Sequence, residues 1–229
     1  MLKKLIISSF ALINKIWLMY ISKGTSKLVG GSFFRVLYNV EKNNFVHIHN
    51  TDTSKTKIDI KGNGNSIFCH NSLISECQFS ISGSNNTILI GKNVKLRKAN
   101  IIIRGNGCTL EIGDRTTFGG IRIINVGSEN KISIGQDCLF SDKIELWASD
   151  THYIYNENDN LINQEKPVFI GNCVWVGSRV IILKGVTISD GSIIGMGALV
   201  TKNVPANSIS VGNPNKIIKE KISWSLKAK

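Results

Sequence analysis

Six apolar residues recur at every sixth position near the C-terminus of the chain: Ile170, Val176, Ile182, Ile188, Ile194 and Val200. Four residues after each of them stands a small or β-branched side chain: Val174, Val180, Val186, Ser192, Ala198 and Val204. An α-helix, with about 3.6 residues per turn, does not produce a strict period of six. A β-solenoid with three short strands per coil does, because one six-residue unit forms each flat side. The sequence therefore predicts a β-solenoid in this region.

The middle of the chain repeats with a longer period. Four related segments are GNGNSI at 62–67, GSNNTI at 83–88, GNGCTL at 105–110 and GSENKI at 127–132. Their last residues follow one another at steps of 21, 22 and 22 positions. Each period fits one coil of three strands with about four extra residues at a corner, where glycine and asparagine tolerate the left-handed backbone region. We therefore predict an all-β solenoid over 57–212.

Composition limits the class of partner. The chain has 229 residues and a formal net charge of +12. The repeats favour one elongated domain, and the charge suits an anionic cofactor, an acidic glycan or an anionic membrane. Nucleic acid is disfavoured, because the lysines are scattered and no nucleic-acid-binding motif is present. The five cysteines are odd in number and form no CxxC pair, which indicates reduced structural thiols in a cytoplasmic protein.

The N-terminal segment is apolar and basic. Its apolar stretch, 5–21, is interrupted by Asn14 and Lys15. No small-residue cleavage site follows, which argues against a signal peptide, and the stretch is short for a membrane-spanning helix. We predict a helical segment over 1–25 that either lies on the inner face of the membrane or packs on the solenoid or a trimer partner. The other predicted segments are a lead-in over 26–56 and a basic C-terminal tail over 213–229.

The six-residue ladder breaks once, over 148–166. This stretch is polar, rich in Asn and Asp, and holds the only histidine in the C-terminal half, His152. Insertions in a solenoid project as loops on one face, and loops on a rigid scaffold are where chemistry tends to be placed. The loop is therefore the best candidate for a functional site.

The chain resembles the hexapeptide-repeat acyltransferases in the segment VFIGNCVWVGSRVIILKGVTISDGSIIGMGALVTKNVPANSISVGNP, which spans 168–214. The likeness extends over 60–220 and is strongest over 147–218. It implies a left-handed parallel β-helix, an exception to the usual right-handed crossover. It also implies a homotrimer with sites between neighbouring subunits, acetyl-CoA as the co-substrate, and no metal. Within the family, the segment SDTHYIYN resembles the active-site loop of capsule and sialic acid O-acetyltransferases.

Acetyl transfer to a hydroxyl needs a base for the hydroxyl proton and donors for the oxyanion. A histidine suits the first role, because its unperturbed pKa lies near neutral pH. The resemblance makes His152 the general base and places Trp175 in the same site, while Asp150 stands close enough in sequence to orient the imidazole. The positions that match cofactor contacts of the family are Ser178, Met196, Thr201, Lys202, Lys216 and Lys219. Candidate acceptor contacts are Trp147, Asp150, Tyr153, Asn156 and Lys166.

These features predict an acetyl-CoA-dependent O-acetyltransferase that acts on a cell-surface, capsular glycan or its precursor by direct attack. N-acetylation of an amino-sugar nucleotide stays open, although no GxGxxG nucleotide-binding motif is present. A γ-type carbonic anhydrase would need three suitably spaced histidines, and His47, His49 and His70 are far from His152 in the sequence. A non-catalytic scaffold or glycan-binding module would keep the repeats without needing the site pattern.

Overall fold

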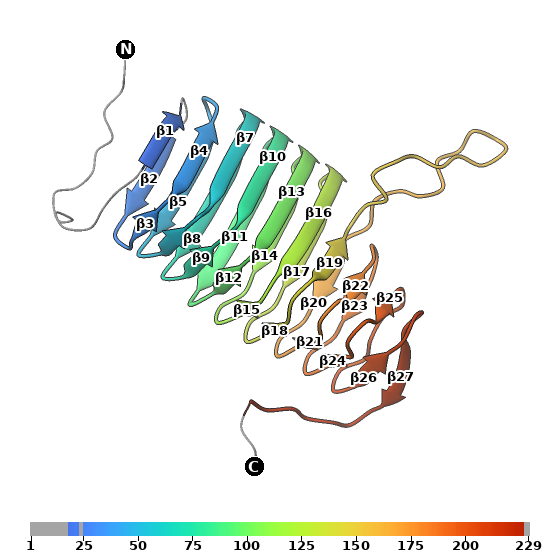
Figure 1. The fold of residues 1–229 in the computed structure, drawn as a ribbon. Coiled ribbons are helices and arrows are strands. Elements are labelled where there is room, and N and C mark those ends of the chain that lie inside the picture. The colour runs from blue at the N-terminus through green and yellow to red at the C-terminus, as the bar shows by residue number, and fades with distance from the viewer. Residues whose placement is uncertain (1–17, 23–24, 227–229) are drawn as a thin grey trace.

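The computed structural model describes residues 18–22 and 25–226. They form a parallel β-solenoid in which the chain passes through three sheets in turn (Figure 1). Sheet A contains β1 (Leu18–Ser22), β4 (Val36–Val40), β7 (Lys57–Asn63), β10 (Gln78–Ser84), β13 (Ala99–Asn106), β16 (Ile121–Ser128), β19 (Ile144–Trp147), β22 (Ile181–Ile182) and β25 (Leu199–Val200). Sheet B contains β2 (Thr25–Val29), β5 (Phe45–His49), β8 (Ser66–His70), β11 (Thr87–Lys92), β14 (Thr109–Ile112), β17 (Lys131–Ile134), β20 (Val168–Ile170) and β23 (Thr187–Ile188).

Sheet C completes the prism with β3 (Phe33–Phe34), β6 (Asp52–Ser54), β9 (Leu73–Ser75), β12 (Lys95–Arg97), β15 (Thr117–Phe118), β18 (Leu139–Phe140), β21 (Trp175–Val176), β24 (Ile193–Ile194), β26 (Ile209–Val211) and β27 (Lys216–Lys219). β27 turns back and pairs antiparallel with β26, which closes the C-terminal end of the sheet. We name the corners by the sheets that they join in chain order: the A–B, B–C and C–A corners.

The six-residue period places one apolar side chain of each unit inside the prism. Ile170 pairs with Ile188 in sheet B, Val176 with Ile194 in sheet C, and all four are at most 3% exposed. Stacked coils therefore form continuous apolar columns, and burial of these columns stabilises the solenoid. The predicted β-solenoid is confirmed, including the inward position of the residues that start each unit.

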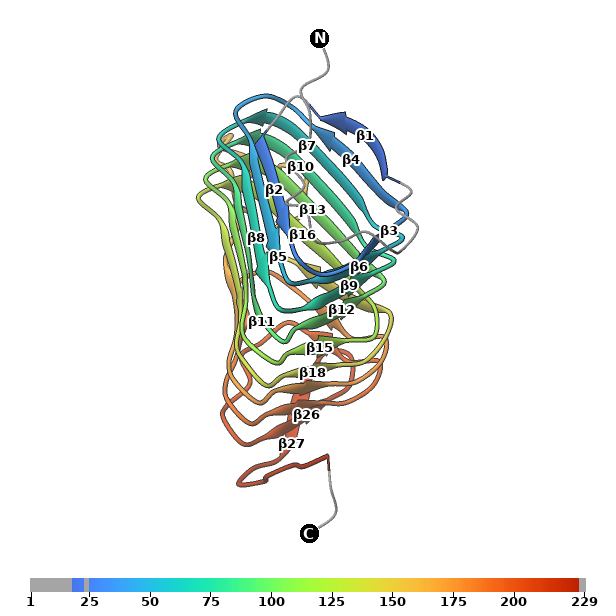
Figure 2. The ribbon, with the colours of Figure 1, turned by 90° about the vertical axis from the view of Figure 1, so that its left-hand side faces the viewer.

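The extra residues of the longer coils widen the N-terminal half. In sheet A, β13 and β16 have eight residues each, whereas β22 and β25 have two. Figure 2 shows the wide coils at the N-terminal end and the narrow ones at the C-terminal end. In the wide coils a ladder of buried asparagines crosses from coil to coil, with Asn65 Nδ2 donating to Asn44 Oδ1 at 2.9 Å and to the Gly83 carbonyl at 2.9 Å. These bonds satisfy buried polar groups where the backbone bends.

The structure differs from the prediction for the N-terminal part. Residues Leu18–Ser22 form a strand that pairs in parallel with β4, so the predicted helix is wrong for this part of 1–25, and residues 1–17 lie outside the described residues. The predicted lead-in also belongs to the solenoid, because β4, β5 and β6 pair in register with β7, β8 and β9. Their inward residues alternate with period two and so lack the six-residue signature. Within 18–22 and 25–226, the structure contains no helix long and apolar enough to cross a membrane.

Candidate functional site

The predicted loop leaves the A–B corner between β19 and β20 and projects far from the prism (Figure 1). Its outer part is a short hairpin in which Tyr155 and Leu161 form an antiparallel bridge. At the tip, Asn156 Oδ1 accepts hydrogen bonds from the backbone N–H groups of Asn158, at 3.0 Å, and Asn160, at 2.9 Å. The Asn156 side chain, a candidate acceptor contact, thus has a structural partner within the hairpin.

His152 is exposed near the base of this arm. Asn163, on the returning segment of the arm, holds the backbone around His152. Asn163 Nδ2 donates to the His152 carbonyl at 2.8 Å, and Asn163 Oδ1 accepts the Ile154 N–H at 2.7 Å. No hydrogen bond joins Asp150 to the His152 ring in the described part of the chain. No sequence pattern indicates this role of Asn163, because the contact spans eleven positions within an irregular loop.

Lys184 anchors the outgoing and the returning segment of the arm to the solenoid. Its Nζ donates to Asp150 Oδ2 at 2.6 Å and to the carbonyls of Asn163, at 2.7 Å, and Gln164, at 3.0 Å. Burial opposes ionisation of Asp150, but the hydrogen bonds from Lys184 and Asn163 outweigh burial and lower its pKa. Asp150 therefore acts as an ionised anchor of the loop in this chain, where the sequence suggested an orienting partner for His152.

Trp175 lies on the outer face of sheet C and is 41% exposed. Beyond β27 the tail returns along the B–C corner, where the Ile222 N–H donates to the Asn207 carbonyl at 2.9 Å. This path brings Trp224 against Trp175, with ring centroids 6.0 Å apart, and its Nε1 donates to the Cys173 carbonyl at 2.7 Å. Trp224 is a site neighbour that the sequence did not reveal, since its docking depends on how the tail folds back.

Ser178 and Met196 follow strands of sheet C and lie one coil apart at the C–A corner. The Ser178 hydroxyl donates to Asp142 Oδ1 and is also linked to the Ser141 hydroxyl at 2.7 Å. The bond from Ser178 is the main cause of a lowered Asp142 pKa. The hydroxyl is therefore already engaged, whereas Met196 is 74% exposed and free to contact a ligand.

Thr201 and Lys202 follow β25 and lie at the A–B corner. The buried Asn215 side chain accepts hydrogen bonds from their backbone N–H groups, at 2.9 Å and 3.2 Å respectively. Lys216 and Lys219 are exposed on β27 at the C-terminal end of sheet C. The predicted cofactor residues thus occupy the last coils but do not form one cluster.

The remaining candidate acceptor contacts differ in their surroundings. Trp147 Nε1 donates to Glu145 Oε2 at 2.7 Å, and the Arg122 guanidinium carbon lies 5.0 Å from the centre of the Trp147 ring, so Trp147 is held on sheet A. Tyr153 is 68% exposed on the arm, with its ring 6.5 Å from that of Tyr155. Lys166 is exposed at the root, where its backbone N–H donates to the Ala148 carbonyl at 3.3 Å.

The predicted site residues lie on two different edges of the prism. His152, Thr201 and Lys202 lie at or beyond the A–B corner, whereas Trp175 and Ser178 lie on sheet C and the C–A corner. Since sheet C is the side opposite the A–B corner, one chain does not bring His152 to Trp175. A site that contains both residues needs two copies of the chain.

Histidines also gather away from this region. The rings of His47, His49 and His70 lie 5.3–6.4 Å from one another on the outer face of sheet B. Desolvation, followed by the neighbouring charges of His70, Lys27 and His49, lowers the pKa of His47. In the described part of the chain, no group of three or more His, Cys, Asp or Glu side chains is arranged to hold a metal ion. The histidines therefore give no support to a carbonic anhydrase.

Comparison with known proteins points to one family. The family model "Bacterial transferase hexapeptide (six repeats)" matches residues 167–202. A polysialic acid O-acetyltransferase of Neisseria meningitidis is 35% identical over 166 residues, covering 62% of this chain and 67% of the relative. The crystal structure of the polysialic acid O-acetyltransferase OatWY aligns with a TM-score of 0.67 and 27% identity, over 92% of this chain and 93% of that one. The polySia-specific acetyltransferase NeuO aligns with a TM-score of 0.64 and 29% identity, over 91% and 87%.

Proposed function

This chain belongs to the hexapeptide-repeat acyltransferases, and we propose that it transfers acetyl from acetyl-CoA to a hydroxyl of an acidic capsular polysaccharide. The enzyme class and the left-handed β-helix follow from the family. The acidic polysaccharide is supported by the names of the relatives above together with the net charge of +12. The observation that carries the proposal is the projecting arm, which presents an exposed histidine on a backbone fixed by Asn163 and Lys184.

In the proposed reaction, His152 removes the proton from the acceptor hydroxyl as its oxygen attacks the thioester carbonyl. The tetrahedral intermediate then collapses and releases coenzyme A as the thiol, so that one C–S bond breaks and one C–O bond forms. Direct attack needs no acyl-enzyme. Cys173 is the one exposed cysteine in the described part of the chain, and no hydrogen bond joins its thiol there to a histidine or carboxylate that would activate it as a nucleophile.

The assembly in this proposal is a homotrimer in which the arm of one subunit reaches sheet C of its neighbour. Two observations support it: His152 and Trp175 lie on different edges of one chain, and the arm exposes Tyr153, Ile154, Tyr155 and Ile162. An isolated arm with this much apolar surface in water is unfavourable, and a neighbouring subunit would cover it. A monomer in multi-angle light scattering at the concentration of the assay would contradict the shared site.

The proposal is tested by measuring coenzyme A release from acetyl-CoA with polysialic acid, a neutral capsular oligosaccharide and glucosamine as acceptors. We expect release with the acidic polymer and an acetylated product that mild alkali hydrolyses, as an ester does. An alkali-stable product formed on glucosamine would replace the proposal by N-acetylation. Binding of neither coenzyme A nor any acceptor in calorimetry would favour the non-catalytic scaffold.

Loss of the Trp224 side chain is expected to weaken the site without unfolding the chain. Trp224→Ala removes the aromatic contact with Trp175, and such pairs contribute about 0.5–1.5 kcal/mol, or roughly 2- to 12-fold. We therefore expect kcat/KM to fall by this factor, with little change in the midpoint of thermal unfolding. Leu226→Ala is the control, because it truncates another exposed apolar side chain of the same tail that belongs to none of the candidate contacts. Unchanged kcat/KM in Trp224→Ala would mean that the tail plays no part in the site.

A further inference from the structure

In the first coils of the solenoid, the C–A corner carries long charged side chains at backbone positions where the other corners carry asparagine or glycine. Further along, charged residues occupy such positions at the other corners too, with Glu129 at the A–B corner and Arg115 and Asp137 at the B–C corner. In these first coils, the left-handed residues of the A–B corner include Asn43, Gly64, Asn85 and Gly107, and those of the B–C corner include Gly30, Asn50, Asn71 and Asn93. The equivalent residues of the C–A corner are Arg35, Lys55, Glu76 and Lys98. Asparagine and glycine adopt this backbone region most readily, and lysine and arginine share no such preference. A residue type that does not favour its local backbone conformation is expected at a position where the side chain serves a function.

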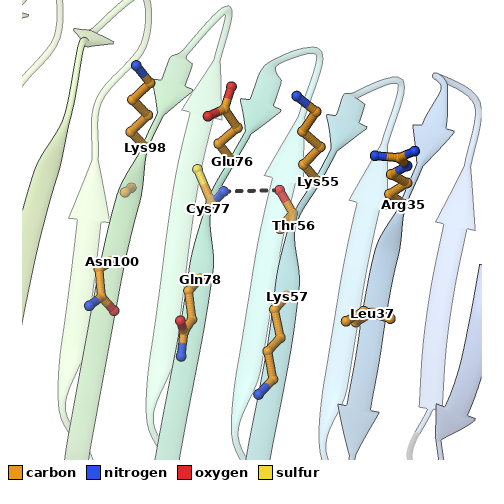
Figure 3. A pocket seen from close by; sticks show the side chains of 11 residues that line it. Arg35, Leu37, Lys55, Thr56, Lys57, Glu76, Cys77, Gln78, Lys98 and Asn100 are labelled. Carbon is orange, nitrogen blue, oxygen red and sulfur yellow. Dashed lines mark hydrogen bonds between the residues drawn. The ribbon is translucent and has the colours of Figure 1, made fainter.

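These side chains line an open groove of about 480 Å³ that runs from coil to coil (Figure 3). Arg35, Lys55, Glu76 and Lys98 form one row, and Leu37, Lys57, Gln78 and Asn100 form a second row on sheet A. Between the rows lie the buried Thr56 and Cys77, where the Cys77 N–H donates to the Thr56 hydroxyl at 3.4 Å. The groove therefore presents four cations against one carboxylate, with amide groups beside them.

None of the cations of this groove forms an ion pair with another described residue. The ion pairs among residues 18–22 and 25–226 are Arg115–Asp137, Lys131–Glu111 and Lys184–Asp150. None of them includes Arg35, Lys55, Lys57 or Lys98, and all four side chains are exposed. Because neighbouring strands of a sheet are about 4.8 Å apart, the groove repeats positive charge along the solenoid axis at intervals of one or two coils.

The same corner leads to the proposed transfer site. Beyond Lys98, the left-handed residues of the C–A corner include Lys143 and Arg179, and Arg179 directly follows Ser178. Lys98 and Arg179 are three coils apart, which corresponds to roughly 14 Å along the axis. A ligand that lies in the groove and continues along the corner would therefore arrive at Ser178 and the outer face of sheet C.

We propose that the groove of Arg35, Lys55, Lys57 and Lys98 binds a stretch of an anionic polysaccharide that carries one carboxylate on each sugar, at a distance from the transfer site. The inference rests on the proposed function and adds to it a basis for preferring long acceptors. Three of the four cations, Arg35, Lys55 and Lys98, lie in one row, which fits one polymer chain. In the second row, Gln78 and Asn100 offer amides for sugar hydroxyls. No aromatic side chain lines the groove, so the base stacking typical of single-stranded nucleic acid has no platform here.

The test replaces Lys55, Lys57 and Lys98 together by glutamate. The control replaces Lys42, Lys61 and Lys92 together by glutamate, which makes the same change in net charge among exposed lysines of the N-terminal coils outside the groove. Binding of fluorescently labelled long polysialic acid is measured by anisotropy at low and moderate salt, and KM and kcat are measured with the long polymer and with a short oligomer. Equal midpoints of thermal unfolding establish that both variants are folded.

We expect the groove variant to bind the long polymer at least 10-fold more weakly than the control, with a smaller dependence on salt, an increased KM for the polymer and an unchanged kcat. The short oligomer should not distinguish the two variants. If the groove and control variants bind the polymer equally, the proposed role of the groove is wrong, whether or not turnover is observed. The same holds if the unaltered protein does not bind the polymer. If the groove variant loses binding to phosphatidylserine vesicles or to DNA by the same factor as it loses binding to polysialic acid, the assignment of the groove to a glycan is overturned. If the unaltered protein binds the polymer through the groove but transfers no acetyl group, the proposed function fails and the groove stands.

Discussion

Replacing His152 by alanine is expected to lower kcat by about 10²–10⁴-fold, the usual contribution of a general base. The acceptor hydroxyl then has to lose its proton to water, because no other histidine lies in the C-terminal half of the chain. The solenoid should keep its stability, since the side chain is exposed on a projecting arm and makes no contact with the core. The measurement is steady-state release of coenzyme A with the acidic polymer, together with the midpoint of thermal unfolding.

The matched control for this variant is Glu157→Ala, which truncates another exposed polar side chain of the same arm. Its kcat should stay within about twofold of the unaltered protein, as for most surface substitutions. If His152→Ala retains near-normal turnover, His152 is not the base. If both variants lose activity equally, the arm has a general structural role and the specific assignment to His152 fails.

The repeats made the C-terminal coils predictable in detail. A strict period of six leaves no alternative to short strands on flat sides, and Ile182 and Val200 are buried as the period required. The N-terminal coils were harder to predict from the sequence. The buried residues Val36, Tyr38 and Val40 recur with period two, and this pattern does not by itself indicate a solenoid. The interrupted apolar stretch that leads into Leu18–Ser22 has a composition that suits a helix as well as a strand, and only pairing with β4 distinguishes the two.

The sequence predicted where in the chain the candidate site lies, but not which residues contact one another there. An insertion with a lone histidine identifies the arm, but the bonds from Asn163 and Lys184 depend on how an irregular loop folds over a corner. Trp224 reaches Trp175 from 49 positions further along the chain, by a path that no periodicity encodes. The separation of His152 from Trp175 likewise depends on the folded prism, because the number of residues between two positions does not say which side or corner each one occupies.

Lys184→Met is expected to lower kcat by roughly 10- to 100-fold while His152 itself is unchanged. The Lys184 ammonium donates to three oxygen atoms of the arm, and its side chain is only 16% exposed. Methionine preserves much of the volume but leaves the Asp150 carboxylate and two carbonyls without this donor. The arm then shifts or frays at its root, and displacement of a catalytic group by about 1 Å can cost about 10²-fold in rate.

Because the pKa of Asp150 is lowered, its ion pair with Lys184 anchors the arm independently of the protonation of the base on that arm. A carboxyl group with a lowered pKa stays ionised through the range near neutrality in which an imidazole ordinarily titrates, so the Lys184 pair is lost only at more acidic pH. Lys184→Met should therefore lower kcat across the whole pH profile without moving its midpoint, and should speed proteolysis within 148–166. Lys131→Met, which removes a more exposed ion pair on sheet B, should change neither. If the midpoint of the pH profile shifts while its plateau value of kcat is unchanged, Lys184 acts on the charge of His152. If activity is unaltered, the arm is positioned by other contacts, such as those of a neighbouring subunit.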